Sequence, residues 1–438
     1  MCKFAILLLL PMSIRAEDPG ALPAARQETG LVLRDVSPSQ YMPSWLKIGG
    51  QIRGRFESPS GTSLLNSNAD SYYLSRIRVD LAVKPTPWLR FVVQAQDARV
   101  GAFNTAPATT TLYNPMDLRQ GFVELTHEGR ISASLRAGRQ EFVLGGERLI
   151  GGADWWMSRT FDALDLTLSY GTAKVDFIAG SPVQTDTGRC DRHKAGEHLY
   201  AAYGHLTAFH ATIEPYLLFK QNLLIRSETA GVGDALVASP GVRVAGTLPG
   251  RFDYIAEGGV QRGSWSSDRI SARAGTAALG WIVAAVSWKP RVSVEYNYAS
   301  GDRNARDGVR ATFDQFYPSN HLYYGMIDQF GWKNLKNLRT GFDFVVRSKL
   351  RVRADYNDFR LATVQDSLYG TTGAAAVTNR SATSDHAGFG LNTIAFYQWT
   401  KLWKFGAGIG HLWAGEYLRQ SQHTAGYTYP YIMFAGTF

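Results

Sequence analysis

Charged and apolar residues alternate one by one along residues 73–99, YLSRIRVDLAVKPTPWLRFVVQAQDAR. Arg76, Arg78 and Asp80 hold every second position, and Ile77 and Val79 lie between them. Successive side chains of a β-strand point to opposite faces, so the segment predicts a strand with one charged and one apolar face. The core of a soluble protein does not tolerate such charges. A closed barrel in a membrane requires them, because its outer face meets lipid and its inner face meets water.

The same alternation recurs along the whole chain. We count about 18 such segments, each near the roughly 9 to 11 residues that a tilted membrane strand requires. The predicted strands are 46–57, 71–83, 88–99, 118–127, 131–140, 162–170, 173–181, 197–207, 211–222, 240–248, 252–262, 270–284, 288–299, 338–347, 350–361, 386–398, 402–413 and 426–438. The sequence therefore predicts an all-β fold, a transmembrane antiparallel up-and-down β-barrel of about 18 strands, roughly 16 to 18.

The predicted connections alternate in length. A long connection after residue 57 is followed by the short KPTP, and the long connections 141–161, 182–196, 300–337 and 362–385 are each followed by a tight turn. Outer-membrane barrels have long outer loops and tight periplasmic turns, so both ends of the chain are expected in the periplasm.

Aromatic residues agree with this orientation. Tryptophans fall at the expected periplasmic ends of strands and tyrosines near the outer ends, where the two membrane interfaces favour them. These residues are Trp45, Trp88, Trp288, Trp399 and Trp403, and Tyr72, Tyr73, Tyr296 and Tyr298. The chain ends on YPYIMFAGTF, an aromatic closing strand typical of bacterial outer-membrane barrels, although Gly436 stands where a larger apolar residue is commoner.

The N-terminus predicts export. Residues 1–16, MCKFAILLLLPMSIRA, combine Lys3, an apolar run and Ala16 in the pattern of a secretory signal peptide. A signal-anchor helix is the alternative, but the apolar run is far shorter than the roughly 20 residues of a membrane helix. We expect a short periplasmic segment over about 17–44 and one barrel domain over 17–438. With the signal removed, Cys190 stands alone, so no disulfide framework is expected.

The alternation assigns many charged residues to a water-filled lumen. By register, the inward set comprises Lys47, Arg53, Arg55, Arg76, Arg78, Asp80, Arg90, Glu124, Arg136, Arg243, Glu295, Arg339, Asp343, Arg347, Arg351, Arg353 and Asp355. For any single arginine, bracing against a neighbouring acid is an equal alternative. Cations outnumber acids in the set, however, and rings of arginine select anions, so the set as a whole predicts a cationic ladder.

Residues 135–180, LRAGRQEFVLGGERLIGGADWWMSRTFDALDLTLSYGTAKVDFIAG, resemble the Gly-Arg-Gln strand end, long loop and following strand of the alginate export family of outer-membrane barrels. The segment from Glu295 to Leu335 is similar to a large outer loop common in bacterial members. The resemblance implies a barrel of about 18 strands whose arginine-lined channel conducts an anionic uronate polymer. On the matching motif it carries over Arg139 and Gln140 as pore-lining residues.

Two transport functions and one enzymatic function are compatible with these features. The favoured one is a channel in the outer membrane of a Gram-negative cell, surrounded by lipid, that passes an alginate-like uronate polysaccharide. The alternative is an uptake porin for small anionic solutes, because the 141–161 loop with Trp155, Trp156 and Arg159 is a candidate constriction. The sequence leaves open the direction of transport, the oligomeric state, which long loop plugs the lumen, and whether a periplasmic export partner feeds the pore.

A barrel enzyme is the remote third class. GAGIG at 406–410 has the glycine spacing of a nucleotide loop, but no helix follows it, and small residues in a strand are the simpler interpretation. No GxSxG, HExxH or P-loop motif occurs. We therefore expect no enzymatic activity, no cofactor and no metal site. The loop acids Asp302, Asp307, Asp314 and Asp328 are expected to be solvated, with calcium binding as the alternative. Because the arginines alternate along strands and form no patch, nucleic acid is not an expected partner.

Overall fold

The computed structural model describes residues 42–62, 64–65, 69–102, 111–228, 231–286, 288–346 and 349–438. The predicted signal peptide, 1–16, and most of the predicted periplasmic segment, 17–44, lie outside these described residues. Neither helix in the described ranges is long and apolar enough to cross a membrane.

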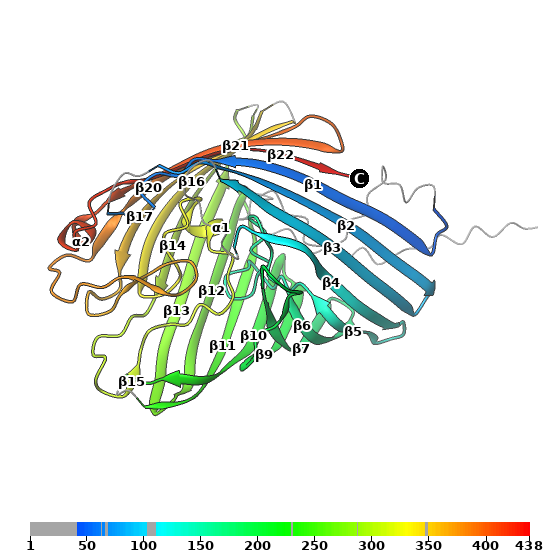
Figure 1. Ribbon diagram of the computed structural model, residues 1–438, viewed down its shortest axis with the longest axis horizontal. Coiled ribbons are helices and arrows are strands. Elements are labelled where there is room, and N and C mark those ends of the chain that lie inside the picture. Colours follow the sequence, from blue (N-terminus) through cyan, green and yellow to red (C-terminus); the bar gives the residue numbers. More distant parts are fainter. Residues whose placement is uncertain are drawn as a thin grey trace, which may run out of the picture.

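The long strands form one closed antiparallel ring (Figure 1), which confirms the predicted fold class. The 18 wall strands are β1 (Leu46–Glu57), β2 (Tyr72–Thr86), β3 (Leu89–Ala102), β4 (Asn114–His127), β5 (Ser132–Gln140), β6 (Phe161–Tyr170), β7 (Ala173–Gln184), β9 (Glu197–Ala208), β10 (Ala211–Arg226), β11 (Val232–Leu248), β12 (Phe252–Trp265), β13 (Asp268–Ile282), β14 (Arg291–Ala299), β16 (Leu335–Val346), β17 (Leu350–Leu361), β20 (His386–Gln398), β21 (Trp403–Ala414) and β22 (Tyr427–Thr437). The first strand pairs with the last, from Gln51↔Thr437 to Glu57↔Tyr431. The sheet therefore has no free edge that a membrane would have to accommodate.

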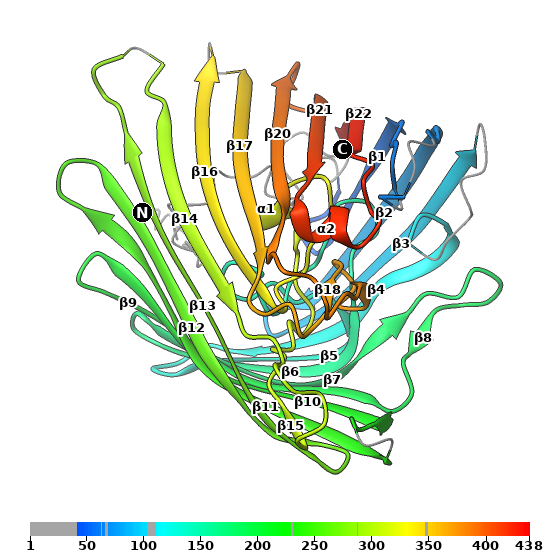
Figure 2. The same cartoon turned by 90° about the vertical axis from the view of Figure 1, so that its left-hand side faces the viewer.

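Six short elements lie in the connections. They are β8 (Arg192–His193), β15 (Val309–Arg310), α1 (His321–Tyr324), β18 (Leu368–Tyr369), β19 (Ala375–Val377) and α2 (Glu416–Gln420). Figure 2 shows α1 inside the ring of strands.

The predicted strand bounds agree closely with the structure except at β11, which begins at Val232 and not at residue 240. Proline cannot donate a backbone hydrogen bond, so it is uncommon inside a strand of a sheet. In the structure Pro240 lies inside β11 opposite Leu217, and the pairing of β11 with β12 skips from Ala238↔Arg262 to Gly241↔Gly259. The ladder is interrupted where the missing N–H falls, so the proline is accommodated.

Long and short connections separate to opposite ends of the barrel, as predicted for most of the chain. Two connections on the long-loop end, 227–231 and 266–267, are themselves short, and the strands that flank them, β10 to β13, run 14 to 17 residues. Both chain ends of the described barrel lie at the short-turn end, since the start of β1 pairs with the end of β22.

Aromatic rings cover glycines on the outer face where the ring closes. A Cβ atom on Gly54 would lie 2.3 Å from the ring of Phe434, and one on Gly436 would lie 2.7 Å from the ring of Trp403. Gly436 is therefore small because Trp403 packs across it, which is a known way of shielding a glycine in a sheet. Tyr72, expected in the outer girdle, instead faces the interior and donates a hydrogen bond to Glu57 at 2.7 Å.

The largest apolar core of this barrel lies inside the ring, at its long-loop end. Its central side chains come from the connection 300–334, which was expected as an outer loop and folds inward, and among them Phe313, Tyr324, Ile327, Phe330 and Trp332 are almost completely buried. The ring of Phe330 stacks on Phe359 of β17 with 3.9 Å between the centroids. The loop is thus held in the lumen by hydrophobic burial against the wall.

Candidate functional site

Burial alternates along β2 as the sequence pattern requires. Arg76 and Arg78 are 1% and 4% exposed, whereas Ile77 and Val79 are 49% and 48% exposed. An outer-membrane barrel exposes apolar side chains to lipid on its outer face, so the arginines face the interior. The pairing of neighbouring strands then assigns the interior face all around the ring.

Most of the expected pore-lining residues share this interior face. The register places there Lys47, Arg53, Arg55, Asp80, Arg90, Glu124, Arg136, Gln140, Arg243, Glu295, Arg339, Asp343, Arg351, Arg353 and Asp355. Lys47 and Arg351 are exposed at the short-turn rim. Arg347 lies outside the described residues.

Arg139 is on the opposite face from the one expected. It follows the interior position Gly138 and precedes the fully buried Gln140, and its guanidinium group pairs with Asp162 at 2.8 Å on the outer side of β6. Because the side chains of a strand alternate between its two faces, only one of two consecutive residues can face the lumen. The motif assigned both Arg139 and Gln140 to the pore, and it is wrong for Arg139.

Wall carboxylates neutralise many of the interior arginines. Arg90 pairs with Glu124 at 3.0 Å, Arg136 with Asp165 at 2.8 Å, Arg353 with Asp343 at 3.5 Å, and Arg339 with Asp355 at 3.7 Å, while Arg243 bonds to Glu214. These pairs brace neighbouring strands, and together they make a lumen of mixed charge.

A different arrangement holds on β1, β2 and β4. Four arginines, Arg53, Arg76, Arg78 and Arg119, are buried on the interior face here, and we call them the arginine cluster. The connection 141–160 folds onto them, and its Asp154 contacts Arg76 at 2.5 Å and Arg78 at 2.9 Å. The first residue of this loop, Glu141, pairs with Arg119 at 2.6 Å.

Arg119 is absent from the predicted inward residues because β4 contains an irregularity. Strict alternation from Glu124 assigns Arg119 to the lipid face. The pairing with β3 instead passes from Gln94↔Gln120 to Ala95↔Leu118, so Arg119 is the extra residue of a β-bulge and turns inward. No signal in the local sequence marks the bulge, since its position depends on the partner strand.

The two long loops join each other inside the barrel. Ile150 and Tyr317 form a parallel bridge, with hydrogen bonds from the Tyr317 N–H to the Leu149 carbonyl at 2.7 Å and from the Gly151 N–H to the Tyr317 carbonyl at 2.9 Å. Arg159, a predicted gate residue, donates to the carbonyls of Gly151 and Pro318 and so also ties the loops together. Both candidate loops therefore enter the lumen, where hydrogen bonds join them to each other.

The two joined loops contact the wall on two sides of the ring. At one side Asp154 contacts the arginine cluster, and at the other Arg148 pairs with Glu295 of β14 at 2.7 Å. Arg148 also lies over the ring of Tyr323, with its Cζ atom 3.5 Å from the centroid. The loops consequently span the interior between β2 and β14.

The 300–334 loop packs against a stretch of β21 whose interior positions are occupied by glycines. Gly406, Gly408 and Gly410 occupy alternate interior positions of β21, and Met326 and Ile327 pack against the last two. The GAGIG segment is therefore part of a wall strand against which the loop packs, and it does not form a nucleotide-binding loop.

Trp155 of the 141–160 loop contacts both the wall and the 300–334 loop. Its ring lies 3.9 Å from the Cζ atom of Arg55 and 5.2 Å from the ring of His321, and its Nε1 donates to the hydroxyl of Tyr429 at 3.3 Å. Burial and the charge of Arg55 lower the pKa of His321 to about 3, so this imidazole is neutral at physiological pH. Burial also raises the pKa of Asp328, in the same loop, to about 7.

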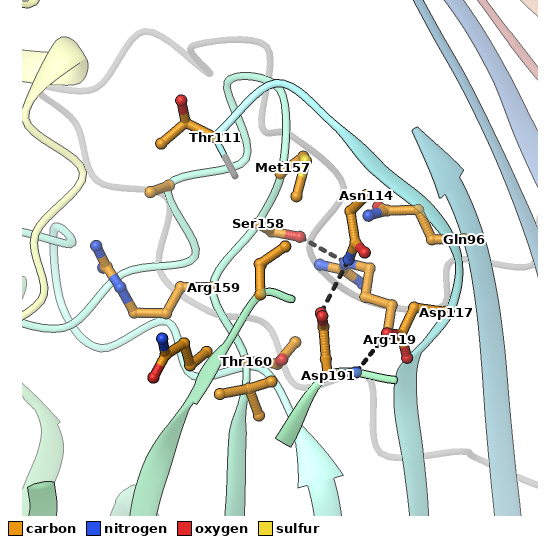
Figure 3. A pocket seen from close by; sticks show the side chains of 14 residues that line it. Gln96, Thr111, Asn114, Asp117, Arg119, Met157, Ser158, Arg159, Thr160 and Asp191 are labelled. Atoms are coloured by element: carbon orange, nitrogen blue, oxygen red, sulfur yellow. Dashed lines mark hydrogen bonds between the residues drawn. The ribbon is translucent and has the colours of Figure 1, made fainter. Parts of the chain in front are cut away.

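A cavity of about 320 Å³ lies between the 141–160 loop and the wall (Figure 3). Polar groups from three segments line it: Ser158 bonds to Arg119, and the amide of Asn114 donates to Asp191 at 2.9 Å. Figure 3 shows these side chains converging on the same space. Hydroxyl, amide, guanidinium and carboxylate groups around a space of this size suit a small polar solute.

The described wall contains hydroxyl–histidine contacts of the type used in catalysis. Ser181 Oγ lies 2.8 Å from Nδ1 of His198, and Thr428 Oγ1 lies 2.7 Å from Nδ1 of His411. Within the described ranges no carboxylate pairs with His198, and the nearby Asp162 is engaged by Arg139. No group of three or more potential metal ligands is found among the described residues.

Comparison with known proteins supports the architecture. The alginate export family matches residues 44–430. Among solved structures, Pseudomonas aeruginosa OpdQ is 10% identical with a TM-score of 0.60 and covers 91% of this chain and 99% of its own. The outer membrane protein OprD from Pseudomonas aeruginosa is 12% identical with a TM-score of 0.57, covering 93% and 98%. These likenesses concern the fold alone. Comparison with curated proteins yields no match.

Proposed function

Since the chain belongs to the alginate export family and is an outer-membrane channel, we propose that it passes an anionic uronate polysaccharide through its arginine-bearing lumen. The observation that carries this proposal is the arginine cluster. Four buried guanidinium groups from β1, β2 and β4 meet at the depth where the 141–160 loop enters the lumen. We expect a solute that moves past the loop on this side to meet them.

Guanidinium groups suit this solute by their chemistry. They stay charged at all physiological pH values, and their planar fork matches the two oxygens of a carboxylate. A uronate polymer presents one carboxylate per sugar. Toward the short-turn end the same wall continues with Arg90 and Arg136, whose charges Glu124 and Asp165 partly offset. Conduction requires sites that bind the solute but also release it, and partly neutralised arginines meet that requirement.

A channel for small anionic solutes is the second candidate. The favouring observation is the amount of interior space that the two joined loops occupy, together with a cavity of about 320 Å³ beside them, which is of the order of a single sugar and its hydration water. A polymer requires a continuous passage, whereas a small carboxylate requires only gaps around the loops.

Planar-bilayer conductance tests the proposal. At low salt the protein should favour anions, and the preference should fall as salt rises, because the Debye length shortens from about 30 Å at 0.01 M to about 3 Å at 1 M. Uronate oligomers should block the current more strongly than neutral oligomers of the same length. A joint Arg78→Gln and Arg119→Gln variant should lose both properties.

Arg291→Gln is the matched control, since it removes a positive charge that two wall carboxylates already offset, Asp253 at 2.6 Å and Asp343 at 3.5 Å. Cation selectivity of the natural chain at low salt would contradict both transport proposals. If anions are favoured but uronate oligomers block no better than neutral ones, the polysaccharide proposal fails and the small-solute channel replaces it.

A further inference from the structure

The strands around the arginine cluster supply it with amides and no carboxylates. The side-chain oxygens of Gln51, Gln94 and Gln96 accept hydrogen bonds from three of its guanidinium groups. In the part of the chain that the structure describes, both carboxylates that form ion pairs with the cluster, Asp154 and Glu141, belong to the 141–160 loop. The positive charge is thus part of the wall, and its countercharge is part of a loop.

Other interior arginines are neutralised by the wall itself. The pairs are Arg55–Glu57, Arg90–Glu124, Arg136–Asp165, Arg243–Glu214, Arg291–Asp253, Arg339–Asp355 and Arg353–Asp343. Strands of a closed barrel keep such pairs together whatever the loops do. Among the interior arginines that the structure describes, those of the cluster would lose their countercharge if the 141–160 loop moved.

Asp154 binds the cluster as a free carboxylate would. One oxygen lies 2.5 Å from Arg76 and 2.9 Å from Arg78, and the other lies 3.1 Å from the second terminal nitrogen of Arg78. Burial opposes ionisation of Asp154, but Arg76, Arg78 and Arg119 outweigh it and hold the pKa of its carboxyl far below the usual range. The side chain is therefore a charged, two-oxygen ligand in a site for carboxylates.

The backbone next to Asp154 is strained. Ala153 has φ of 50°, a left-handed conformation that is unfavourable for a residue with a Cβ atom. Contacts to Asp154 compensate for this strain, so a competing ligand on the arginines would allow the segment to relax.

We propose that Asp154 is an internal competitor that occupies the carboxylate-binding site of the channel, and that a solute carboxylate displaces it from Arg76 and Arg78. This inference rests on the proposed function and adds the identity of the site. The solute class is a carboxylate-bearing sugar. Displacement exchanges one ion pair for another, so the positive charge of the wall is neutralised before and after the step.

Block of the bilayer current by glucuronate, with glucose as the neutral match, tests the competition. In an Asp154→Asn variant the apparent dissociation constant for glucuronate should fall roughly tenfold or more, because a neutral amide binds arginine less strongly than a carboxylate does. Glucose should show no change. Asp343→Asn is the control, since it removes an equal charge from a wall pair. An unchanged constant in Asp154→Asn, or an equal fall in Asp343→Asn, would overturn the inference.

A second measurement keeps the test valid if Asp154→Asn does not fold. In a Cys190→Ser background, a Met157→Cys substitution reports on the loop three residues beyond Asp154. Glucuronate, and not glucose, should accelerate labelling of this cysteine by a charged thiol reagent. An identical rate with both sugars would contradict displacement.

The two proposals fail separately. If long uronate oligomers do not cross the natural channel but glucuronate competes with Asp154, the polysaccharide function is wrong and the carboxylate site stands. If oligomers cross and neither glucuronate measurement responds, the internal competitor is wrong and the function stands.

Discussion

The sulfur of Met326 lies 2.9 Å from the position that a Cβ atom on Gly408 would take. The ring of Tyr431 would be closer still, at 2.5 Å. Gly408 belongs to the wall and Met326 to the inserted 300–334 loop, so the loop docks where the wall lacks a side chain. Any larger residue at this interior position must displace either the loop or the neighbouring tyrosine.

A Gly408→Val substitution should therefore undock the loop and raise single-channel conductance. Valine suits a strand, so the wall itself should persist. Gly258→Val is the control, because a Cβ atom there would meet only the Ala274 carbonyl oxygen at 3.8 Å. Equal conductance in the two variants would show that the docked loop does not limit the current.

The lumen register can be checked with cysteines at two consecutive residues of β3. The side chain of Arg90 is 39% exposed in the interior, whereas Phe91 is 41% exposed on the outer face. In a Cys190→Ser background, a charged thiol reagent should label Arg90→Cys and spare Phe91→Cys in a bilayer. The reverse result would shift the strand by one residue.

Loop docking should depend on pH through Asp328. Its pKa is raised to about 7 by burial, with Arg55 opposing the shift, so the docked loop retains a proton that the undocked loop releases above its ordinary pKa near 3.8. Docking stability from this group is complete below about pH 4 and is lost as pH rises to about 7.

Open-state probability of the natural channel should accordingly rise between about pH 4 and pH 7 more steeply than that of Asp328→Asn, which cannot ionise. The comparison also removes the influence of His321, which both proteins share. Parallel pH profiles for the two proteins would exclude Asp328 as the group responsible.

Closure of the ring should be sensitive to Gly54. A Cβ atom there would lie 2.3 Å from the ring of Phe434 and 2.5 Å from the hydroxyl of Tyr73. We expect Gly54→Val to destabilise the folded barrel by roughly 1 to 3 kcal/mol through overpacking. The midpoint temperature of the heat-induced gel shift should fall relative to that of Gly258→Val. Identical midpoints would mean that the aromatic residues at the closure can repack.

The local sequence determines the barrel because the alternation within each wall strand does not depend on the other strands. Alternation at Arg76, Ile77 and Arg78 assigns one face to water and one to lipid without reference to any other strand. Three strands, 46–57, 350–361 and 386–398, have the predicted bounds. The pore-facing position of most charged residues follows from the same period.

Other features depend on contacts between distant residues. Arg119 faces inward because its pairing with β3 contains a bulge, and the Arg76–Asp154 ion pair joins residues 78 positions apart. Alternation states which face a side chain occupies but contains no information about what lies opposite it inside the ring. Whether an arginine is braced by its wall or neutralised by a loop was decided only when the 141–160 and 300–334 loops packed into the lumen, because hydrophobic burial there depends on the assembled shape of all the strands.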